Sequence, residues 1–430
     1  MYFVLRSEVL TYIFFNQDML NIIMSNKTKV AIQKINSENV ESAVFSALEL
    51  INAQSLMKVG QTILLKPNIL GAKPPERAVT THPKVVEAVI HWIKQFSPSK
   101  VYVCDSAGTQ KPGATEIAMK VSEIKALCDK EGVECVPFEK TERKIYKVPD
   151  PLELEEITSS ILLEEADIII NIPKMKTHGQ CLLTCCIKNM FGTILLGNKA
   201  KTHAQASILD HFSAALADIY SVSKPHLTVI DGYLCQEGQG PSAGEVVKMD
   251  LILAGYDPVA LDSIVCNIIG FNPEDVIHLK KAAEKKLGTM NLEEIEVLGS
   301  QVKDVFRKFK KPKIRPVSAP LPRWLANYIG KTIFKATVKF NPNKCKLCAT
   351  CWENCPADAI TPPGEIKKGN IPKWNKKKCI TCYCCVELCP HEAVNFKINY
   401  AKNVILSWFP VVLLAVIAVL WLLFAWIFNL

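Results

Sequence analysis

The sequence predicts an α/β domain with a mostly parallel sheet and flanking helices, followed by a small α+β domain and one C-terminal transmembrane helix. Three observations predict this fold class. Short apolar runs alternate with longer helical patterns from Lys27 to about residue 302. Two cysteine runs of identical spacing follow, and the chain closes on a long apolar stretch without charges.

The chain has 430 residues, more than a single typical core holds, so several domains are expected. Its 17 cysteines in so long a chain argue for metal-bound or buried thiols in a reducing compartment. The predicted segments are a disordered N-terminal extension (1–26), the α/β domain (27–302), a basic, proline-rich linker (303–340), the small α+β domain (341–398) and the transmembrane helix (404–428).

The α/β prediction rests on the order of strands and helices. The apolar runs predicted as strands are Val30–Ile35, Thr62–Lys66, Val101–Asp105, Val133–Phe138, Asp167–Ile172, Leu227–Asp231, Met249–Ala254 and Ile295–Leu298. The predicted helices are Glu38–Met57, His82–Phe96, Thr115–Asp129, Ser207–Val222, Pro258–Ile269 and Pro273–Leu287. Runs with no polar residue fit strands that are buried on both faces, which is typical of parallel sheets.

Polar side chains gather in loops that follow predicted strands, where ligands bind in open α/β sheets. The residues predicted to bind a substrate are Lys66, Asn68, Asp105, Lys174 and Asn189, and those predicted to be catalytic are Lys176, Lys188 and His178. Lysines and amides at one sheet edge suit a carboxylate or phosphate, and the histidine suits proton transfer. The alternative for each lysine is an ordinary surface loop, and Asp257 is either a helix cap or a site residue.

The two cysteine runs read Cys345-x2-Cys348-x2-Cys351-x3-Cys355-Pro356 and Cys379-x2-Cys382-x2-Cys385-x3-Cys389-Pro390. This is the spacing of bacterial ferredoxins with two 4Fe–4S clusters, in which the fourth cysteine of each run ligates the other cluster. The predicted ligands are therefore Cys345, Cys348, Cys351 and Cys389 for cluster 1, and Cys379, Cys382, Cys385 and Cys355 for cluster 2. Zinc knuckles or disulfides are the alternative, but zinc sites use paired C-x2-C units. Cys384 has no place in the pattern.

Several motifs of the α/β domain together resemble the domain-of-unknown-function 362 family. They are Lys66-Pro-Asn68, Thr80-Thr-His82-Pro83, Asp105-Ser-Ala-Gly108, Asn171-x-Pro173-Lys174-x-Lys176-Thr177-His178, Lys188-Asn189-x-x-Gly192, Asp231-Gly232 and Asp257-Pro-Val-Ala-x-Asp262. The resemblance covers roughly residues 28–300 and implies an α/β domain, an associated iron–sulfur module and a redox role. The chain departs from the family at Thr184-Cys185-Cys186, where a small residue, usually glycine, is expected after the threonine.

The C-terminal stretch 404–428 contains no charged side chain. As a helix it would be roughly 37 Å long at about 1.5 Å per residue, enough to cross a hydrocarbon core of about 30 Å. Lys397 and Lys402 precede it, so the positive-inside tendency predicts cytoplasmic globular domains and a single-pass anchor in the cell membrane. The basic linker predicts contact with membrane lipid, and nucleic acid is not expected because no binding module is visible.

These observations predict a membrane-anchored iron–sulfur oxidoreductase that passes electrons from a redox partner protein through two 4Fe–4S clusters to a small anionic substrate. One alternative is a non-catalytic electron carrier or adaptor of a membrane redox complex. The other is a maturation factor that passes a cluster or cofactor onward. The substrate, the electron donor, a further cofactor such as a flavin and the oligomeric state do not follow from the sequence.

Overall fold

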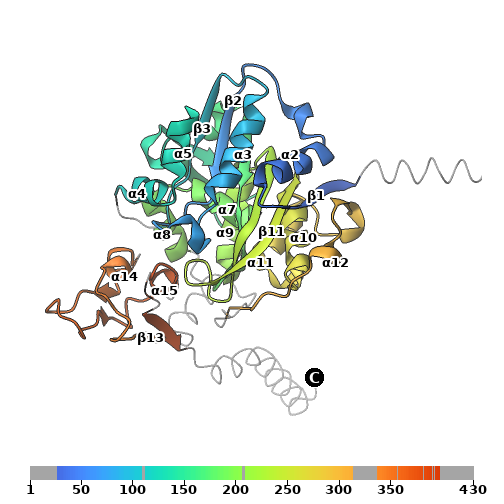
Figure 1. The fold of residues 1–430 in the computed structure, drawn as a ribbon. Helices are drawn as coiled ribbons and strands as arrows, with labels where there is room; N and C mark the ends of the chain where they lie inside the picture. Colours follow the sequence, from blue (N-terminus) through green and yellow to red (C-terminus); the bar gives the residue numbers. More distant parts are fainter. Residues whose placement is uncertain are drawn as a thin grey trace, which may run out of the picture. The chain divides into compact units, whose positions relative to one another are not determined.

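The structure is a computed structural model that describes residues 27–108, 112–205, 209–312, 337–355, 357–380, 382–389, 391 and 393–397. The predicted N-terminal extension, 1–26, lies outside the described residues. The chain divides into two compact units (Figure 1). The first comprises Met1–Lys199 with Ser213–Lys313, and the second comprises Ala200–Phe212 with Ile314–Leu430.

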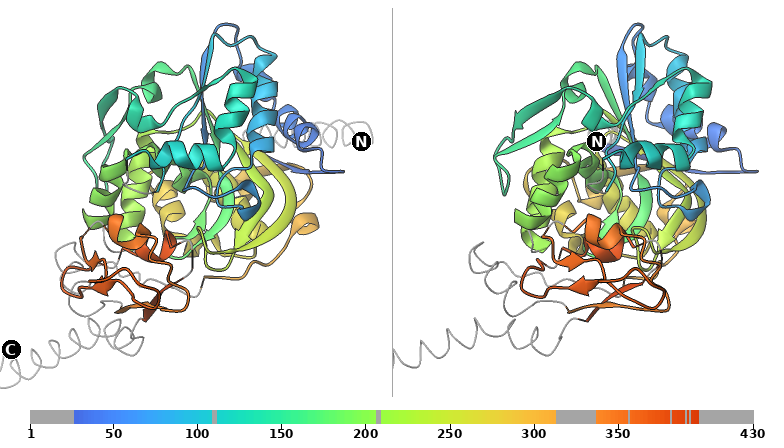
Figure 2. Two further views of the ribbon diagram at one scale, coloured as in Figure 1. Left: turned by 60° about the vertical axis from the view of Figure 1, so that its left-hand side comes forward. Right: turned by 90° about the vertical axis from the view of Figure 1, so that its left-hand side faces the viewer.

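A large sheet forms the centre of the first unit, with strand order β12-β1-β11-β10-β7-β2-β3-β4. The strands are β1 (Thr28–Lys34), β2 (Thr62–Pro67), β3 (Lys100–Val103), β4 (Glu134–Cys135), β7 (Ile168–Ile172), β10 (Leu227–Glu237), β11 (Glu245–Gly255) and β12 (Ile295–Gly299). Strands β10, β7, β2, β3 and β4 run parallel, whereas β11 pairs antiparallel with both β10 and β1. The predicted mostly parallel sheet is therefore a mixed sheet, because β10 and β11 form a long hairpin (Figure 2).

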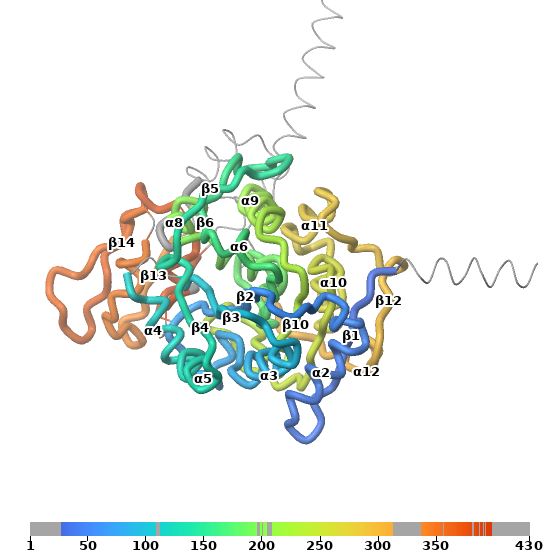
Figure 3. Tube along the Cα trace, turned by 90° about the horizontal axis from the view of Figure 1, so that it is seen from above, coloured from blue at the N-terminus to red at the C-terminus, as the bar shows by residue number. Residues whose placement is uncertain are grey.

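Helices cover both faces of this sheet (Figure 3). One face carries α2 (Val40–Leu50), α3 (Pro83–Lys94) and α5 (Ile124–Glu131), and the other carries α9 (Leu209–Val222), α10 (Pro258–Ile268) and α11 (Ile277–Glu284). The remaining α-helices of the described part of this unit are α4 (Ala114–Val121), α6 (Leu162–Glu165), α7 (Cys186–Asn189) and α12 (Val302–Val305). Helix α8 (Leu196–Gln205) begins in the first unit and continues into the segment Ala200–Phe212 of the second. Each face has its own hydrophobic core, which confirms the predicted α/β arrangement.

Two predicted helices are interrupted by residues in the left-handed backbone region. Asn52, with φ 58°, separates α2 from a short 3-10 turn, Ala53–Leu56. Glu123, with φ 64°, separates α4 from α5. A helical pattern of apolar residues continues across both breaks, so the pattern alone predicts one helix where the backbone forms two segments.

Helix α10 begins at a capping residue. The Asp257 Oδ1 atom accepts hydrogen bonds from the backbone N–H groups of Val259 (2.8 Å) and Ala260 (3.2 Å), and Pro258 occupies the first helical position. Asp257 is therefore a helix cap rather than a residue of the site.

A separate two-stranded ribbon, β5 (Arg143–Lys147) with β6 (Glu156–Ser160), was absent from the sequence prediction (Figure 2).

The second unit contains a small α+β domain built from two equivalent halves. Strand β13 (Thr337–Phe340) pairs with β16 (Val394–Lys397), and β14 (Ile360–Thr361) pairs with β15 (Lys373–Trp374). The first strand of one half thus pairs with the last strand of the other. Helices α14 (Thr350–Glu353) and α15 (Cys384–Glu387) each follow a residue in the left-handed region, Ala349 (φ 67°) and Tyr383 (φ 64°). The structural repeat follows the repeat in the sequence.

The prediction of a C-terminal transmembrane helix requires a correction. Among the residues that the structure describes, no helix is long and apolar enough to cross a membrane, and 404–428 lie outside them. The anchor, and the cell-membrane localisation that depended on it, are therefore withdrawn.

The predicted linker also starts too early: Arg307 N–H donates to Ile268 O (2.9 Å) and Phe309 N–H to Ile269 O (2.9 Å), so its first residues pack on the first unit. Residues 313–336 lie outside the described part.

Candidate functional site

The carboxyl ends of neighbouring parallel strands bring the predicted site residues together. Strand β2 lies between β3 and β7 and is parallel to both. Lys66 lies near the end of β2, opposite Asn171 of β7 in the strand register, and Asp105 follows the end of β3. Because parallel strands end at the same edge of a sheet, three segments far apart in sequence meet there.

A buried ion pair lies at this edge. The Lys66 Nζ atom is 2.7 Å from Asp105 Oδ1, and it also donates to Pro67 O (2.9 Å). The Asp105 carboxylate further accepts the backbone N–H groups of Ile69 (2.5 Å) and Ser106 (2.9 Å). Burial lowers the pKa of Lys66, and the adjacent Asp105 carboxylate opposes that shift. Removing either partner would leave a buried charge without compensation.

The Asn189 amide connects helix α7 to the ion pair. Its Oδ1 atom accepts hydrogen bonds from Asn68 Nδ2 (2.9 Å) and Lys66 Nζ (3.4 Å). Its Nδ2 atom donates to Asn171 Oδ1 (2.7 Å). The end of α7 is thereby fixed against β2 and β7.

Lys176 is a buried lysine that forms no ion pair with a carboxylate of the described residues. It lies on β8 (Lys174–His178), and its Nζ atom donates to Asn68 Oδ1 (2.7 Å) and Val79 O (2.5 Å). Within the described part of the chain, no carboxylate forms an ion pair with it. Burial lowers the pKa of Lys176 well below its usual value, and the charges of Lys188 and Lys174 lower it further. An anion beside Nζ would reverse these effects.

Lys174 has a carboxylate partner that the sequence prediction omitted. Its Nζ atom is 2.7 Å from Asp231 Oδ2, and both side chains are fully buried. The Asp231 carboxylate also accepts the N–H groups of His82 (2.7 Å) and Tyr233 (3.0 Å). The sequence shows Asp231 near the end of an apolar run, but only the pairing of β8 with β10 places it opposite Lys174.

Lys199 of α8 is a second residue that sequence reasoning missed. Its Nζ atom donates to the carbonyl oxygens of Ser106 and Ala107 (3.0 Å to the latter), next to Asp105. Burial lowers the pKa of Lys199 to about 8, and Asp105 opposes the shift. No pattern in the sequence distinguishes it from a surface lysine.

The other two residues predicted to be catalytic, His178 and Lys188, lie outside the two ion pairs described above. The His178 Nδ1 atom accepts the N–H groups of Gln180 (3.1 Å) and Cys181 (3.2 Å), so Nε2 is the nitrogen through which it could transfer a proton. Lys188 is half-buried, with Nζ 5.5 Å from the ring centroid of Phe191. Of the neighbouring charges, that of Lys188 lowers the pKa of Lys176 the most. Their catalytic roles stay predictions.

Lysines outnumber the carboxylates paired with them at this edge of the sheet. The lysines are Lys66, Lys174, Lys176 and Lys199, with Lys188 half-buried beside them, and the carboxylates paired with them are Asp105 and Asp231. Cations thus exceed carboxylates in the network. The excess of lysines makes this edge of the sheet electropositive.

The cysteines of the second unit form two groups. Burial, followed by the negative charges of Cys348, Cys389 and Cys345, raises the pKa of Cys351 to about 12. Those four thiols line one small cavity. Burial also raises the pKa of Cys385, and the next contributions come from the charges of Cys382, Cys379, Cys355 and Cys351.

Backbone donors to sulfur follow the same repeat. The Ala359 N–H donates to Cys355 Sγ (3.2 Å), and the Ala393 N–H donates to Cys389 Sγ (3.3 Å). Such donors stabilise thiolates and raise cluster potentials. Converging thiols in an apolar shell, with N–H···S bonds already formed, fit iron–sulfur clusters. The Cys384 Sγ atom donates to Cys382 O at 3.8 Å.

Known protein families match two separate parts of the chain. The family described as "Domain of unknown function (DUF362)" matches residues 63–267, and the "4Fe-4S dicluster domain" family matches residues 337–390. The chain is also 30% identical over 236 residues to the thylakoid-associated protein sll1697 of Synechocystis sp., a match that covers 54% of this chain and 70% of the relative.

Two solved structures show a partial likeness. A protein from Thermotoga maritima matches with a TM-score of 0.34 and 13% identity, covering 58% of each chain. The lactate racemase apoprotein from Thermoanaerobacterium thermosaccharolyticum matches with a TM-score of 0.33 and 15% identity, covering 60% of this chain and 56% of the racemase. The chain thus spans little more than half the length of the solved structures that it matches.

Gly192 tests how closely the segment after α7 must approach the ion pair. A Cβ atom there would overlap Asp105 Oδ1 and lie 2.5 Å from Lys66 Nζ. We expect Gly192→Ala to lower the free energy of unfolding by about 3 kcal/mol or more, since it crowds a packed site and separates a buried ion pair. Gly71→Ala is the matched control, because a Cβ atom there meets nothing within 4 Å. Equal unfolding midpoints in urea for the two variants would contradict the packing described.

Lys199 predicts a dependence of stability on pH. Its pKa falls from 10.5 in the unfolded chain to about 8 in the folded one, so between these values the unfolded state binds more protons. Stability should therefore rise with pH across this window, by on the order of 3 kcal/mol from this group, and be lost as the pH falls toward 8. The free energy of unfolding in urea is measured from about pH 7.5 to about pH 10.5. It should rise less over this range for Lys199→Met than for the exposed control Lys280→Met. The same slope in both variants would refute the buried placement of Lys199.

Proposed function

The chain belongs to the DUF362 family and carries a 4Fe-4S dicluster domain, and from this premise we propose that it is an iron–sulfur oxidoreductase acting on a small anionic substrate. The 4Fe–4S domain accounts for electron transfer. The first unit would supply the substrate site, at the carboxyl edge of β3, β2 and β7.

One observation carries this proposal: Lys176 is 1% exposed and, within the described residues, has no carboxylate partner. A buried lysine in that state is unfavourable unless it is neutral or meets an anion. The nearby lysines favour the second condition, because they attract an anion as well as lowering the pKa of Lys176. An arriving carboxylate or phosphate would provide the missing partner.

Each predicted site residue then has a distinct role. Lys176 and Lys188 would contact the anion, while Lys174 and Lys66, held by their aspartates, would keep the surrounding potential positive. Asn68 and Asn189 would orient the Lys176 ammonium and the end of α7. The His178 Nε2 atom would transfer the proton that accompanies reduction.

We further propose two clusters with the ligand sets predicted from the spacing. When bound, the clusters supply one-electron transfers. The support is that the four cysteines predicted for cluster 1 line one cavity together. The N–H···S bonds to Cys355 and Cys389 would make each cluster easier to reduce.

The test measures reoxidation. The full chain is purified without oxygen, its iron is counted, and it is reduced with dithionite. Recovery of cluster absorbance is then followed after rapid mixing with small carboxylates and phosphates. We expect one class of compound to reoxidise the protein, and Lys176→Met to slow that step by about 10²-fold or more, with unchanged iron content and spectra.

Lys280→Met, at an exposed lysine of α11 that pairs with Glu274, is the control and should keep the full rate. Full activity in Lys176→Met with intact clusters would show that the catalytic assignment is wrong. Reoxidation by another redox protein, with no response to any compound in the panel, would instead identify an electron carrier and contradict the proposed enzyme.

A further inference from the structure

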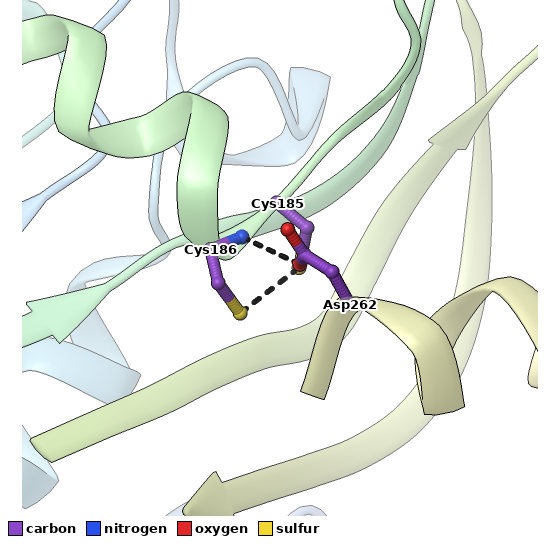
Figure 4. Close-up of side chains that lie close together, drawn as sticks. All are labelled: Cys185, Cys186 and Asp262. Atoms are coloured by element: carbon purple, nitrogen blue, oxygen red, sulfur yellow. Dashed lines mark hydrogen bonds between the residues drawn. The ribbon is translucent and has the colours of Figure 1, made fainter. Parts of the chain in front are cut away.

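Two adjacent cysteines and one aspartate form a cluster in the core on the α10 side of the sheet. Cys185 and Cys186 lie where β9 (Leu182–Thr184) meets α7, and Asp262 lies on α10 (Figure 4). All three side chains are fully buried. One potential ligand atom from each lies within 4.8 Å of those of the other two. This is the position at which the chain departs from the small residue expected from its family.

The sulfur separation is specific. The two Sγ atoms are 3.8 Å apart, far longer than a disulfide bond of about 2.0 Å. Zinc–thiolate bonds are about 2.3 Å long, so a tetrahedral ion would separate two sulfurs by about 3.8 Å. The thiols already have the spacing that one such ion requires.

The Asp262 carboxylate is bonded mainly to the start of α7. Its oxygens accept the backbone N–H groups of Cys186 (2.8 Å) and Ile187 (3.0 Å). Among the described residues, no lysine, arginine or histidine forms an ion pair with it. A carboxylate oxygen retains further acceptor capacity after one such bond, and a buried charge without compensation is unfavourable. A cation bound by the thiols would give this carboxylate a direct ligand of opposite charge, while the net charge of the group stays the same.

We propose that Cys185, Cys186 and Asp262 bind one Zn²⁺ ion, with a small oxygen ligand in the fourth position. Two thiolates exclude Mg²⁺ and Ca²⁺, which take oxygen ligands, and the carboxylate disfavours Cu⁺. Binding releases the two thiol protons, as Zn²⁺ + 2 RSH → Zn(SR)₂ + 2 H⁺. The buried group therefore carries one negative charge both before and after binding.

The ion would stabilise the start of α7. The Cys186 carbonyl accepts a hydrogen bond from Asn171 Nδ2 (3.1 Å), and Asn171 Oδ1 accepts one from Asn189. Ligation would therefore join α10 to the segment that positions Asn189. This role is structural and is independent of the proposed function.

The test is zinc K-edge X-ray absorption on the full chain with its iron–sulfur domain, purified in Zn²⁺ without chelator. We expect one zinc per chain, with two sulfur neighbours at about 2.3 Å and oxygen neighbours at about 2.0 Å. Cys185→Ser/Cys186→Ser should lose this zinc, whereas Cys128→Ser, which replaces a buried cysteine of α5 in the other core, should retain it. Chelation should lower the Tm of the wild-type chain and leave that of the double variant unchanged.

Three results would overturn the proposal. The first is wild-type protein without zinc, in which Asp262 would serve only as a backbone acceptor for α7. The second is zinc with four sulfur neighbours that persists in the double variant, since it would lie in the cysteines of the second unit. The third is a disulfide between Cys185 and Cys186, detected as the loss of about 2 Da in intact mass, which corresponds to two hydrogens released on bond formation.

Discussion

Burying a lysine in a protein is unfavourable unless its charge is paired or lost, and this constraint governs the carboxyl edge of the first unit. Lys66 and Lys174 meet it through Asp105 and Asp231. Each aspartate also accepts backbone N–H groups, so the loops after β2 and β3 and the strand β10 are fixed by the same carboxylates. Lys176 meets the constraint with an amide and a carbonyl oxygen instead, which leaves it responsive to an anion.

The second unit follows a different constraint, which is the equivalence of its two halves. Its strands pair across the halves, and its two helices begin at equivalent left-handed residues. The N–H···S bonds recur at equivalent cysteines, Cys355 and Cys389. The repeat thus positions the cysteines of the second unit, whereas ion pairs and amides position the lysines of the first.

Much of this arrangement could be predicted from the sequence, because it depends on local spacing. Cysteine intervals indicate the 4Fe–4S domain, and apolar runs locate the strands near whose ends Lys66 and Asp105 lie. Other features depend on contacts between distant segments: the antiparallel β11, and the placement of Asp231 and Lys199 beside the site. The transmembrane helix was predicted from hydropathy alone, and the described residues contain no helix that could span a membrane.

The central claim is that Lys176 has no anionic partner until a substrate arrives. Its charge state can be measured directly by ¹⁵N and ¹³C NMR of lysine side chains in the full chain, assigned with Lys176→Met and followed from pH 5 to 10 around the usual lysine pKa of about 10.4. Without a ligand, the account predicts a pKa well below the usual value, and with the anion that reoxidises the protein it predicts a large upward shift. A normal pKa in the absence of a ligand, or no shift when the anion binds, would contradict it.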